Sequence, residues 1–343
     1  MSKSPKHPAK KKPFLQRLTH GLYMTLFVLS LIVVVGYAAL CIFAPKPTVD
    51  SQVTIDPNRQ GDAPVPPAAT GDPDASTASA APVSNELVLN RREGVYTCLL
   101  LGVADQGGTD TIMLGVFDTK AREAYLIYIP RDTVVYQNGK YRKINSTYSG
   151  GEEAVAAAVH DLLGIPVDYW VSVNLKAFQS IVNQIGGVYF NVPVRMDYDD
   201  PYADLHIHIA PGYQLLNGEQ AMGVMRCRNC YSNADIGRAA TQRAFLVALA
   251  KQTIVPSNVT KVTSLINTFS QYVRSSMELK DMVWFGTQAI GMDLDAALTT
   301  GSREGEWISP YWQLDDQSVL ALVNGLGIYE EEVPLKALHI VHP

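Results

Sequence analysis

The sequence predicts an α/β fold in which helices cover both faces of one sheet, preceded by one transmembrane helix. Three observations support this prediction. Strand and helix patterns alternate from residue 94 onward. Residues 21–43 form an apolar run without a charge, and residues 44–85 are rich in Pro, Ala, Ser and Thr. Because 47% of the 343 residues are hydrophobic and 18% are charged, a wholly disordered or collagen-like chain is excluded.

The apolar run at residues 21–43 has the length of a membrane-spanning helix. Its 23 residues suffice for a hydrocarbon core of about 30 Å at about 1.5 Å per residue. A cleaved signal peptide is the alternative, but its apolar run usually has about 7–15 residues. The first 20 residues carry six Lys and Arg and no acid, which predicts that they stay in the cytoplasm. We therefore expect a basic cytoplasmic tail (1–20) and a folded body outside the cell.

Residues 44–85 predict a disordered linker, because their composition cannot bury enough apolar surface to offset the entropy of ordering. Residues 86–343 contain no comparable stretch and predict one domain. The chain has a net charge of −5 although its tail is basic, so the body is acidic. This excludes binding of nucleic acid through a broad basic surface.

The strands of the body follow from its apolar patterns. Residues 95–103 form a near-continuous apolar run, typical of a strand that is buried on both faces. Residues 111–117 and 124–129 flank the polar turn Asp118-Thr119-Lys120 and predict a hairpin. Further extended segments are expected at 170–173, 188–194, 205–208, 223–228 and 337–341.

The helices follow from apolar residues at helical spacing. Residues 152–163 end at Gly164, and residues 175–185 begin after the capping residue Asn174. The apolar faces of these two helices either pack against the sheet or line an apolar tunnel. Further helices are expected after Asn217, from Asp235 to about Thr253, and around 277–292 and 315–326.

Cys227 and Cys230 form a C-x-x-C motif in the predicted external body. A local disulfide, which would shape the loop at 229–234, is the favoured interpretation, and two free thiols are the alternative. A zinc site would need two further ligands, for which His206 and His208 are the nearby candidates. A redox catalytic role is the remaining alternative.

Arginines and carboxylates recur at spacings that place them on common faces. Arg226 and Arg228 are two residues apart on a segment expected to be extended, so both would point to one side. Arg238 and Gln242 share a helix face. Asp235 suits the helix start, whereas Arg238 opposes the helix dipole there unless an anion binds. A surface ion pair between Asp235 and Arg238 is the alternative.

Two further charged residues lie at strand ends, where open α/β sheets place their sites. Asp110 begins one predicted strand, and Arg131 follows the next in the segment Pro130-Arg131-Asp132. Guanidinium groups bind phosphate oxygens and carboxylates bind Mg²⁺. The combination predicts a site for a phosphate together with a divalent cation.

Six segments resemble, in chain order, the LytR–CpsA–Psr (LCP) family. They are LLLGVADQGGTDTIML, IPRDTV, KINSTYSGGEEAVAAAVHDLLGIPVDYWVSVN, IVNQIGGVYFNVPV, GYQLLNGEQAM and MRCR…ADIGRAATQR, and they span about residues 95–255. The resemblance implies a membrane-anchored phosphotransferase of the bacterial cell wall. Such an enzyme moves an anionic glycopolymer, for example teichoic acid or capsule, from a polyprenyl-pyrophosphate carrier to a peptidoglycan sugar hydroxyl and forms a phosphodiester. It also implies a three-layer sandwich with a central mixed sheet and an apolar tunnel for the lipid.

The resemblance assigns roles residue by residue. It implies that Asp110 binds Mg²⁺ or Mn²⁺, with Asp105 in place of the acid that is missing at Ala104, and that Asp235 helps to deprotonate the acceptor. Contacts to the substrate pyrophosphate are implied for Arg131, Arg226, Arg228, Arg238 and Gln242. The catalytic residues would be Asp110, Arg131, Asp235 and Arg238. The chain departs from the family pattern where it lacks arginines, at Gly108, Thr109 and Thr241.

Two other functions remain open. A pyrophosphatase acting on polyprenyl pyrophosphate would use water in place of the sugar hydroxyl. A non-catalytic protein would bind the lipid carrier for regulation, although such a protein does not require the metal-binding acid Asp110.

Overall fold

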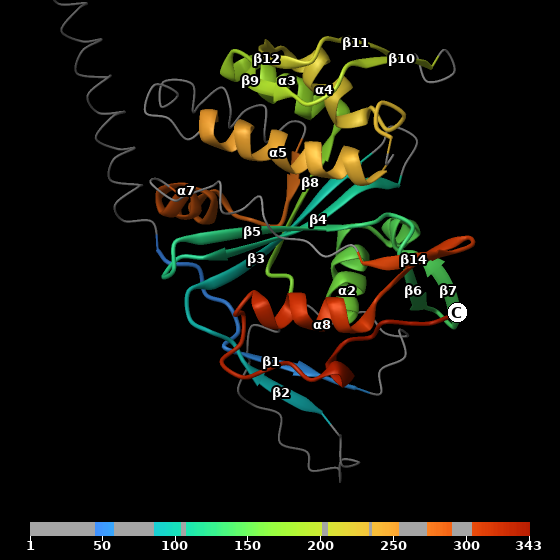
Figure 1. Ribbon diagram of the computed structural model, residues 1–343. Coiled ribbons are helices and arrows are strands. Elements are labelled where there is room, and N and C mark those ends of the chain that lie inside the picture. Colours follow the sequence, from blue (N-terminus) through green and yellow to red (C-terminus); the bar gives the residue numbers. More distant parts are fainter. Residues whose placement is uncertain are drawn as a thin grey trace, which may run out of the picture. The chain divides into compact units, whose positions relative to one another are not determined.

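The computed structural model describes the residues 45–57, 86–103, 108–200, 205–232, 235–253, 273–289 and 304–343 (Figure 1). The chain divides into two compact units. One comprises Met1–Pro47 with Leu279–Thr287, and the other Thr48–Glu278 with Gln288–Pro343. Within the described ranges no helix is long and apolar enough to cross a membrane. The predicted tail (1–20) and transmembrane helix (21–43) lie outside those ranges.

A five-stranded mixed sheet forms the centre of the larger unit (Figure 1). Its strand order is β13–β8–β3–β4–β5, and β3 pairs with β8 in parallel while the other neighbours are antiparallel. The predicted hairpin is confirmed, because the Asp118 carboxylate accepts hydrogen bonds from the backbone N–H groups of Lys120 and Ala121 in its turn. The strands are β3 (Val95–Val103), β4 (Thr109–Asp118), β5 (Glu123–Ile129), β8 (Tyr169–Asn174) and β13 (Val273–Ser275).

Helices α2 (Glu152–Leu163) and α8 (Asp316–Gly325) cover one face of this sheet. The apolar side of α2 is buried in the same core as the strand residues Leu99, Ile112 and Ile127. Gly164 ends α2 in the left-handed conformation, with φ of 61°, as the sequence predicts. The apolar side of α2 therefore packs against the sheet, which was one of the two expected alternatives.

Helix α5 (Asp235–Thr253) covers the opposite face of the sheet and also supports a second core. Its Ala239 packs with Met113 and Tyr128 of the sheet. Its Phe245 is fully buried in the second core, 5.2 Å from Phe190 between ring centroids. The other main elements of this core are α3 (Leu175–Ile185), α4 (Gly218–Arg226), β9 (Val188–Val192), β11 (Leu205–Ile209) and β12 (Gly212–Leu216). Helices therefore lie on both faces of the sheet.

Short two-stranded ribbons complete the larger unit. Their strands are β6 (Val134–Gln137) with β7 (Lys140–Lys143), β10 (Met196–Asp200) with β11, and β14 (Gly305–Ile308) with β15 (Tyr311–Leu314). Two 3₁₀ segments, η1 (Ile144–Gly150) and η4 (Leu335–Ala337), link other elements. Helix α7 (Leu279–Ala289) belongs mainly to the smaller unit.

The predicted linker is wrong for its described N-terminal part. Strand β1 (Gln52–Ile55) pairs with β2 (Leu87–Asn90), and its Val53 and Ile55 are 7% and 4% exposed. These two apolar residues alternate with polar ones, so a strand can turn both toward the core. The average composition of residues 44–85 does not reveal this strand, because the longer polar sequence that follows it dominates that average.

The predicted strand at 337–341 is also wrong. After η4 the backbone N–H of His339 donates to the carbonyl of Asp161, 3.0 Å away. Asp161 lies in the last turn of α2, where carbonyl groups lack partners within the helix. The C-terminal segment therefore donates a hydrogen bond to a carbonyl at the end of α2 and does not join a sheet.

Candidate active site

Asp110 and Arg131 meet at the open end of the β4–β5 hairpin. Strand pairing joins Ile112 to Ile129, and the same register extended by two residues places Asp110 opposite Arg131. The two side chains form an ion pair with 2.6 Å between Arg131 Nη1 and Asp110 Oδ1. Both reach solvent, with side-chain exposures of 31% for Arg131 and 55% for Asp110. The site thus presents a guanidinium and a carboxylate together at one strand end.

A second ion pair extends this end of the sheet. Lys143 Nζ lies 2.9 Å from Asp132 Oδ1, and Arg131 Nε lies 3.9 Å from Asp132 Oδ2. Lys143 was not among the residues expected at the site from the sequence. A signal was present, because the turn Asn138-Gly139 is typical of a tight hairpin. That hairpin pairs Lys143 with Val134, two residues after Asp132.

The expected extended segment at 223–228 is wrong, because most of it belongs to a helix. Arg226 and Arg228 therefore do not lie on one face of a strand. Arg226 is the last residue of α4, and Cys227 is its C-cap. The helix is stable here because Asn217 and Gln220 form a reciprocal capping box and Val224 is buried. Arg226 is half-buried and Arg228 is exposed, just beyond the helix end.

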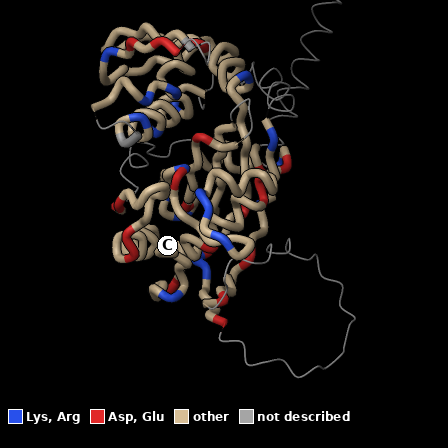
Figure 2. Tube along the Cα trace, turned by 90° about the vertical axis from the view of Figure 1, so that its right-hand side faces the viewer, with Lys and Arg blue, Asp and Glu red and all other residues tan. Residues whose placement is uncertain are grey.

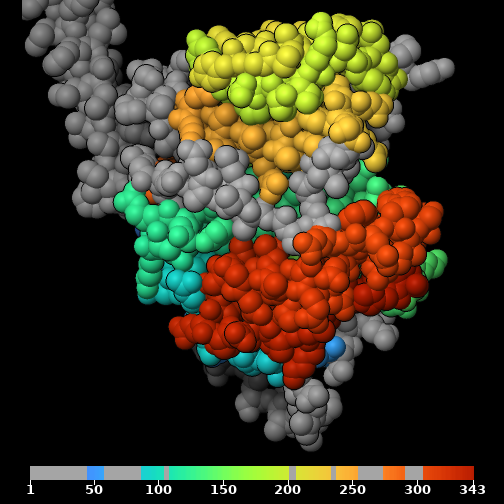
Figure 3. Space-filling view, in the orientation of Figure 1, coloured from blue at the N-terminus to red at the C-terminus, as the bar shows by residue number. Residues whose placement is uncertain are grey.

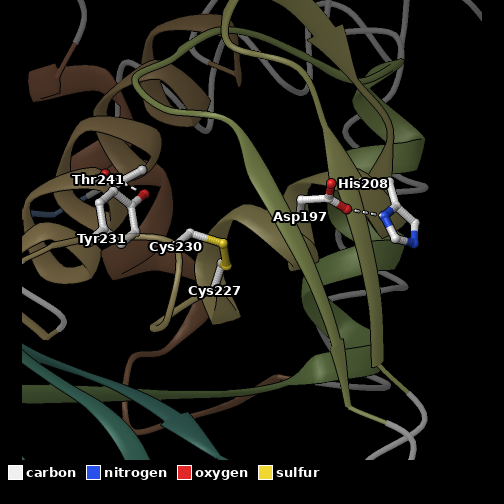
Figure 4. The surroundings of a disulfide bond; sticks show 6 residues. All are labelled: Asp197, His208, Cys227, Cys230, Tyr231 and Thr241. Atoms are coloured by element: carbon white, nitrogen blue, oxygen red, sulfur yellow. Dashed lines mark hydrogen bonds and ion pairs between the residues drawn. A yellow bond between two sulfur atoms is a disulfide. The ribbon is translucent and has the colours of Figure 1, made fainter.

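The predicted disulfide between Cys227 and Cys230 is confirmed (Figure 4). It joins Cα atoms 5.6 Å apart and closes the turn that carries Arg228. Next to it the Tyr231 hydroxyl donates to Thr241 Oγ1 on α5 at 2.8 Å. Burial raises the pKa of the Tyr231 hydroxyl. The disulfide and this hydrogen bond hold the segment after α4 against α5.

Arg238 and Gln242 are buried, with 7% and 2% of their surfaces exposed. The side chain of Gln242 donates from Nε2 to the carbonyl of Met225 at 2.7 Å. That carbonyl belongs to the last turn of α4, next to Arg226. Through this bond Gln242 positions the end of α4, and its predicted contact to the substrate stays a prediction.

The first turns of α5 lie over the half of the hairpin that carries Asp110 and Arg131. Ala239 packs with Met113 and Tyr128, which pair with each other across the strands. The structure thus brings Arg238, next to Ala239, and the Asp110–Arg131 pair to the same part of the sheet. The side chain of Asp235, at the start of α5, and the whole of Asp105 lie outside the described residues.

Along the described chain, Lys and Arg positions are interspersed with Asp and Glu positions (Figure 2). In the part of the chain that the structure describes, no three His, Cys, Asp or Glu side chains already converge as a metal site. His206 and His208 contact Asp199 and Asp197 at 2.6 Å each. The structure uses both cysteines of the C-x-x-C motif in the disulfide, which contradicts the zinc alternative.

The chain also contains a cavity of about 1280 Å³ that is separate from these residues. Helix α2, the β6–β7 ribbon, β1 and the segment Leu338–Val341 line it. None of the predicted site residues contributes to its wall. The candidate site is therefore a surface at a strand end and not this cavity.

The fold and the site together define an α/β protein with a mixed sheet and an arginine–carboxylate cluster at one strand end. Residues 69–326 match the model of the LytR_cpsA_psr family. Since this match covers most of the chain, the protein belongs to that family.

Individual relatives agree with this assignment. The polyisoprenyl-teichoic acid–peptidoglycan teichoic acid transferase TagV of Bacillus subtilis strain 168 is 28% identical over 57% of this chain and 53% of its own length. The solved structure of B. subtilis TagV has a TM-score of 0.60 at 22% identity and covers 71% of this chain and 100% of that one. A structure of TagT bound to LIIa-WTA has a TM-score of 0.58 at 24% identity, covering 68% of this chain and 90% of that one. The chain spans about half the length of the curated TagV sequence.

Proposed function

We propose that this chain is a membrane-anchored phosphotransferase of the bacterial cell wall. It takes an anionic glycopolymer, such as a teichoic acid or capsular polymer, from a polyprenyl-pyrophosphate carrier and joins it to a peptidoglycan sugar hydroxyl. The observation that carries this proposal is the Asp110–Arg131 pair at the end of the hairpin on which α5 packs. Two similar proteins support it, because TagV is named as a teichoic acid transferase and TagT has been solved bound to LIIa-WTA.

The proposed reaction exchanges one phosphorus–oxygen bond for another. The acceptor hydroxyl oxygen bonds to the phosphorus that carries the glycan, and the bond from that phosphorus to the bridging oxygen breaks. Polyprenyl phosphate leaves, and Asp235 is the proposed acceptor of the hydroxyl proton. Arginine side chains stabilise the charge that develops on the phosphate oxygens. This role falls to Arg131, Arg226, Arg228 and Arg238.

The residues present fit a divalent cation at this site. Mg²⁺ in phosphoryl-transfer sites usually binds one or two carboxylates, substrate phosphates and water. Asp110 offers an exposed carboxylate beside Arg131, and Asp105 is proposed as the second. Bound Mg²⁺ or Mn²⁺ would neutralise charge on the phosphoryl group that is transferred.

The proposed location follows from the N-terminal sequence. Residues 1–20 lie in the cytoplasm, residues 21–43 span the cell membrane, and residues 86–343 lie outside. This arrangement would hold the site on the side where peptidoglycan is available.

The deciding experiment supplies the full chain in detergent with a polyprenyl-pyrophosphate-linked glycan, with and without peptidoglycan oligomers. We expect a glycan–peptidoglycan conjugate that requires both the acceptor and Mg²⁺, with loss of product in EDTA. Release of free glycan phosphate without acceptor would identify a pyrophosphatase instead. Binding of the donor with no turnover would identify a non-catalytic carrier-binding protein.

A further inference from the structure

The ribbon β14–β15 is fixed directly to the segment that carries Arg131. The backbone N–H of Trp312, in β15, donates to the carbonyl of Asp132 at 2.9 Å, and Trp312 forms a parallel bridge with Thr133. Trp312 also packs against the main core. The ribbon is therefore anchored at Asp132 and Thr133, directly after Arg131.

This ribbon presents an indole ring to solvent. Trp307, the cross-strand partner of Trp312, is 54% exposed, and its neighbour Ile308 is 38% exposed. Figure 3 shows that the C-terminal part of the chain, coloured orange to red, forms a broad exposed surface. Exposing so much of a tryptophan forgoes burial energy that the short ribbon would otherwise gain.

A chain of contacts links this indole to the site. The ammonium group of Lys143 lies 5.7 Å from the centroid of the Trp307 ring and 2.9 Å from Asp132 Oδ1. Asp132 is adjacent to Arg131 and contacts it at 3.9 Å. An aromatic face and a cationic donor thus stand together next to the proposed pyrophosphate-binding arginine.

We propose that Trp307 and Lys143 form a subsite for a sugar ring of the acceptor glycan, an inference that rests on the proposed function. The C–H face of a pyranose stacks on an indole, which offers a rigid apolar surface at low entropic cost. An ammonium group has three N–H donors, more than its contact with Asp132 uses, for sugar hydroxyl or acetyl oxygens.

The acceptor is the better match than the donor for this subsite. The donor carries a pyrophosphate that arginines can hold by charge. A neutral sugar chain has no charge for the arginines to bind, so its affinity must come from stacking and hydrogen bonds. The subsite supplies these contacts beside the place where the acceptor hydroxyl has to react.

The test measures binding of chitotetraose, a neutral β-1,4-linked N-acetylglucosamine tetramer, to the full chain in detergent by calorimetry. We expect Trp307→Ala to weaken binding by about 10-fold or more and Trp307→Phe to retain most of it, because a phenyl ring still offers a stacking face. Tyr213→Ala is the matched control, since Tyr213 is 73% exposed on β12. Unchanged affinity in Trp307→Ala, or a loss in Tyr213→Ala instead, would overturn the proposal.

A transfer assay separates the two possible sources of the sugar. Trp307→Ala should raise the KM for the peptidoglycan acceptor and leave the KM for the lipid-linked donor unchanged. A rise confined to the donor would refute the assignment to the acceptor. If the wild-type chain transfers nothing, the proposed function fails, while chitotetraose binding still decides whether the sugar subsite exists.

Discussion

At the scale of single residues, the ion pair between Arg131 and Asp110 combines a short contact with access to solvent. The atoms Nη1 and Oδ1 are 2.6 Å apart, yet 55% of the Asp110 side chain is exposed. Exposed ion pairs contribute about 0–1 kcal/mol to stability. The pair therefore has little structural value, which agrees with a role in binding a charged ligand.

Replacing Arg131 should impair transfer much more than folding. Arg131→Ala removes a charge-assisted bond worth about 1.5–3 kcal/mol, so we expect transfer to slow roughly 10- to 100-fold. Arg131→Lys should recover part of the rate, because an ammonium cannot form the two-pronged contact of a guanidinium. Initial rates and melting temperatures of the same preparations check this. Normal transfer with a large drop in melting temperature would show that the residue is structural.

Gln242 should behave in the opposite way, because it is buried and holds the end of α4. Gln242→Ala leaves the carbonyl of Met225 without this donor, which should lower the free energy of unfolding by about 1–3 kcal/mol. Arg228→Ala, at an exposed position after α4, should change it by less than about 0.5 kcal/mol. Urea unfolding of the full chain compares the two variants. Equal stability of both would mean that the Gln242 bond is dispensable.

His208 of β11 should titrate above the ordinary range of a histidine, because two carboxylates lie beside it. The hydrogen bond to Asp197 and the charge of Asp199 raise the pKa of His208 above its ordinary value of 6.5. The protonated pair is therefore fully present below about pH 6.5 and is lost as the pH rises through the raised pKa. An NMR titration of the His208 ring should show this, and Asp197→Asn should lower the midpoint. An identical midpoint in that variant would contradict the pairing.

At the scale of secondary-structure elements, α5 connects the two cores of the larger unit. Ala239 packs on the sheet, while Phe245, six residues later, is buried among residues of α3, α4 and β9. The disulfide and the Tyr231–Thr241 hydrogen bond add a third attachment at the end of α4. The position of the site arginines relative to the hairpin therefore depends on packing on both sides of α5.

Strand β1 should contribute to stability through one face alone. Ile55 is 4% exposed in the main core, and Thr54 beside it is exposed. Ile55→Ala should lower the free energy of unfolding by about 2–5 kcal/mol, because it leaves a cavity among core side chains. The matched control Thr54→Ala should have little effect. If thermal unfolding gives equal shifts for both variants, β1 does not pack as described.

At the scale of the whole chain, charge is arranged in two ways. The first 20 residues are uniformly basic, whereas acidic and basic residues are interspersed over the described body (Figure 2). This contrast supports the proposed orientation, with the N-terminus in the cytoplasm and the body outside, because basic residues next to a membrane span stay in the cytoplasm.

A reporter that is active only in the cytoplasm tests that orientation. Fused after Pro343 it should be silent, because residues 44–343 are expected outside the cell. The same reporter fused before Met1 is the control and should be active. Activity of the C-terminal fusion would overturn the orientation and with it the role in the cell wall.

Several features of the fold could be predicted from local patterns. Strand alternation, helical spacing and capping are local properties of a sequence. They therefore predicted the strand at 95–103, the helix at 152–163 that ends at Gly164, and the helix that begins after Asn174. The C-terminal turn of α4 was missed, because its Gly223 weakens the helical pattern while packing in the core sustains it. Strand β1 was missed for a similar reason, since its partner β2 lies more than thirty residues later.

By itself, the sequence determined the family and the class of fold, and it predicted which arginines and carboxylates would form the candidate site. These follow from residue identity and spacing, which the chain carries locally. Only the tertiary structure decided that Asp110 faces Arg131, that Gln242 is a buried support for α4, and that Lys143 connects Asp132 to Trp307. Such relations depend on register and packing between distant segments, and those arise when the chain buries its apolar faces together.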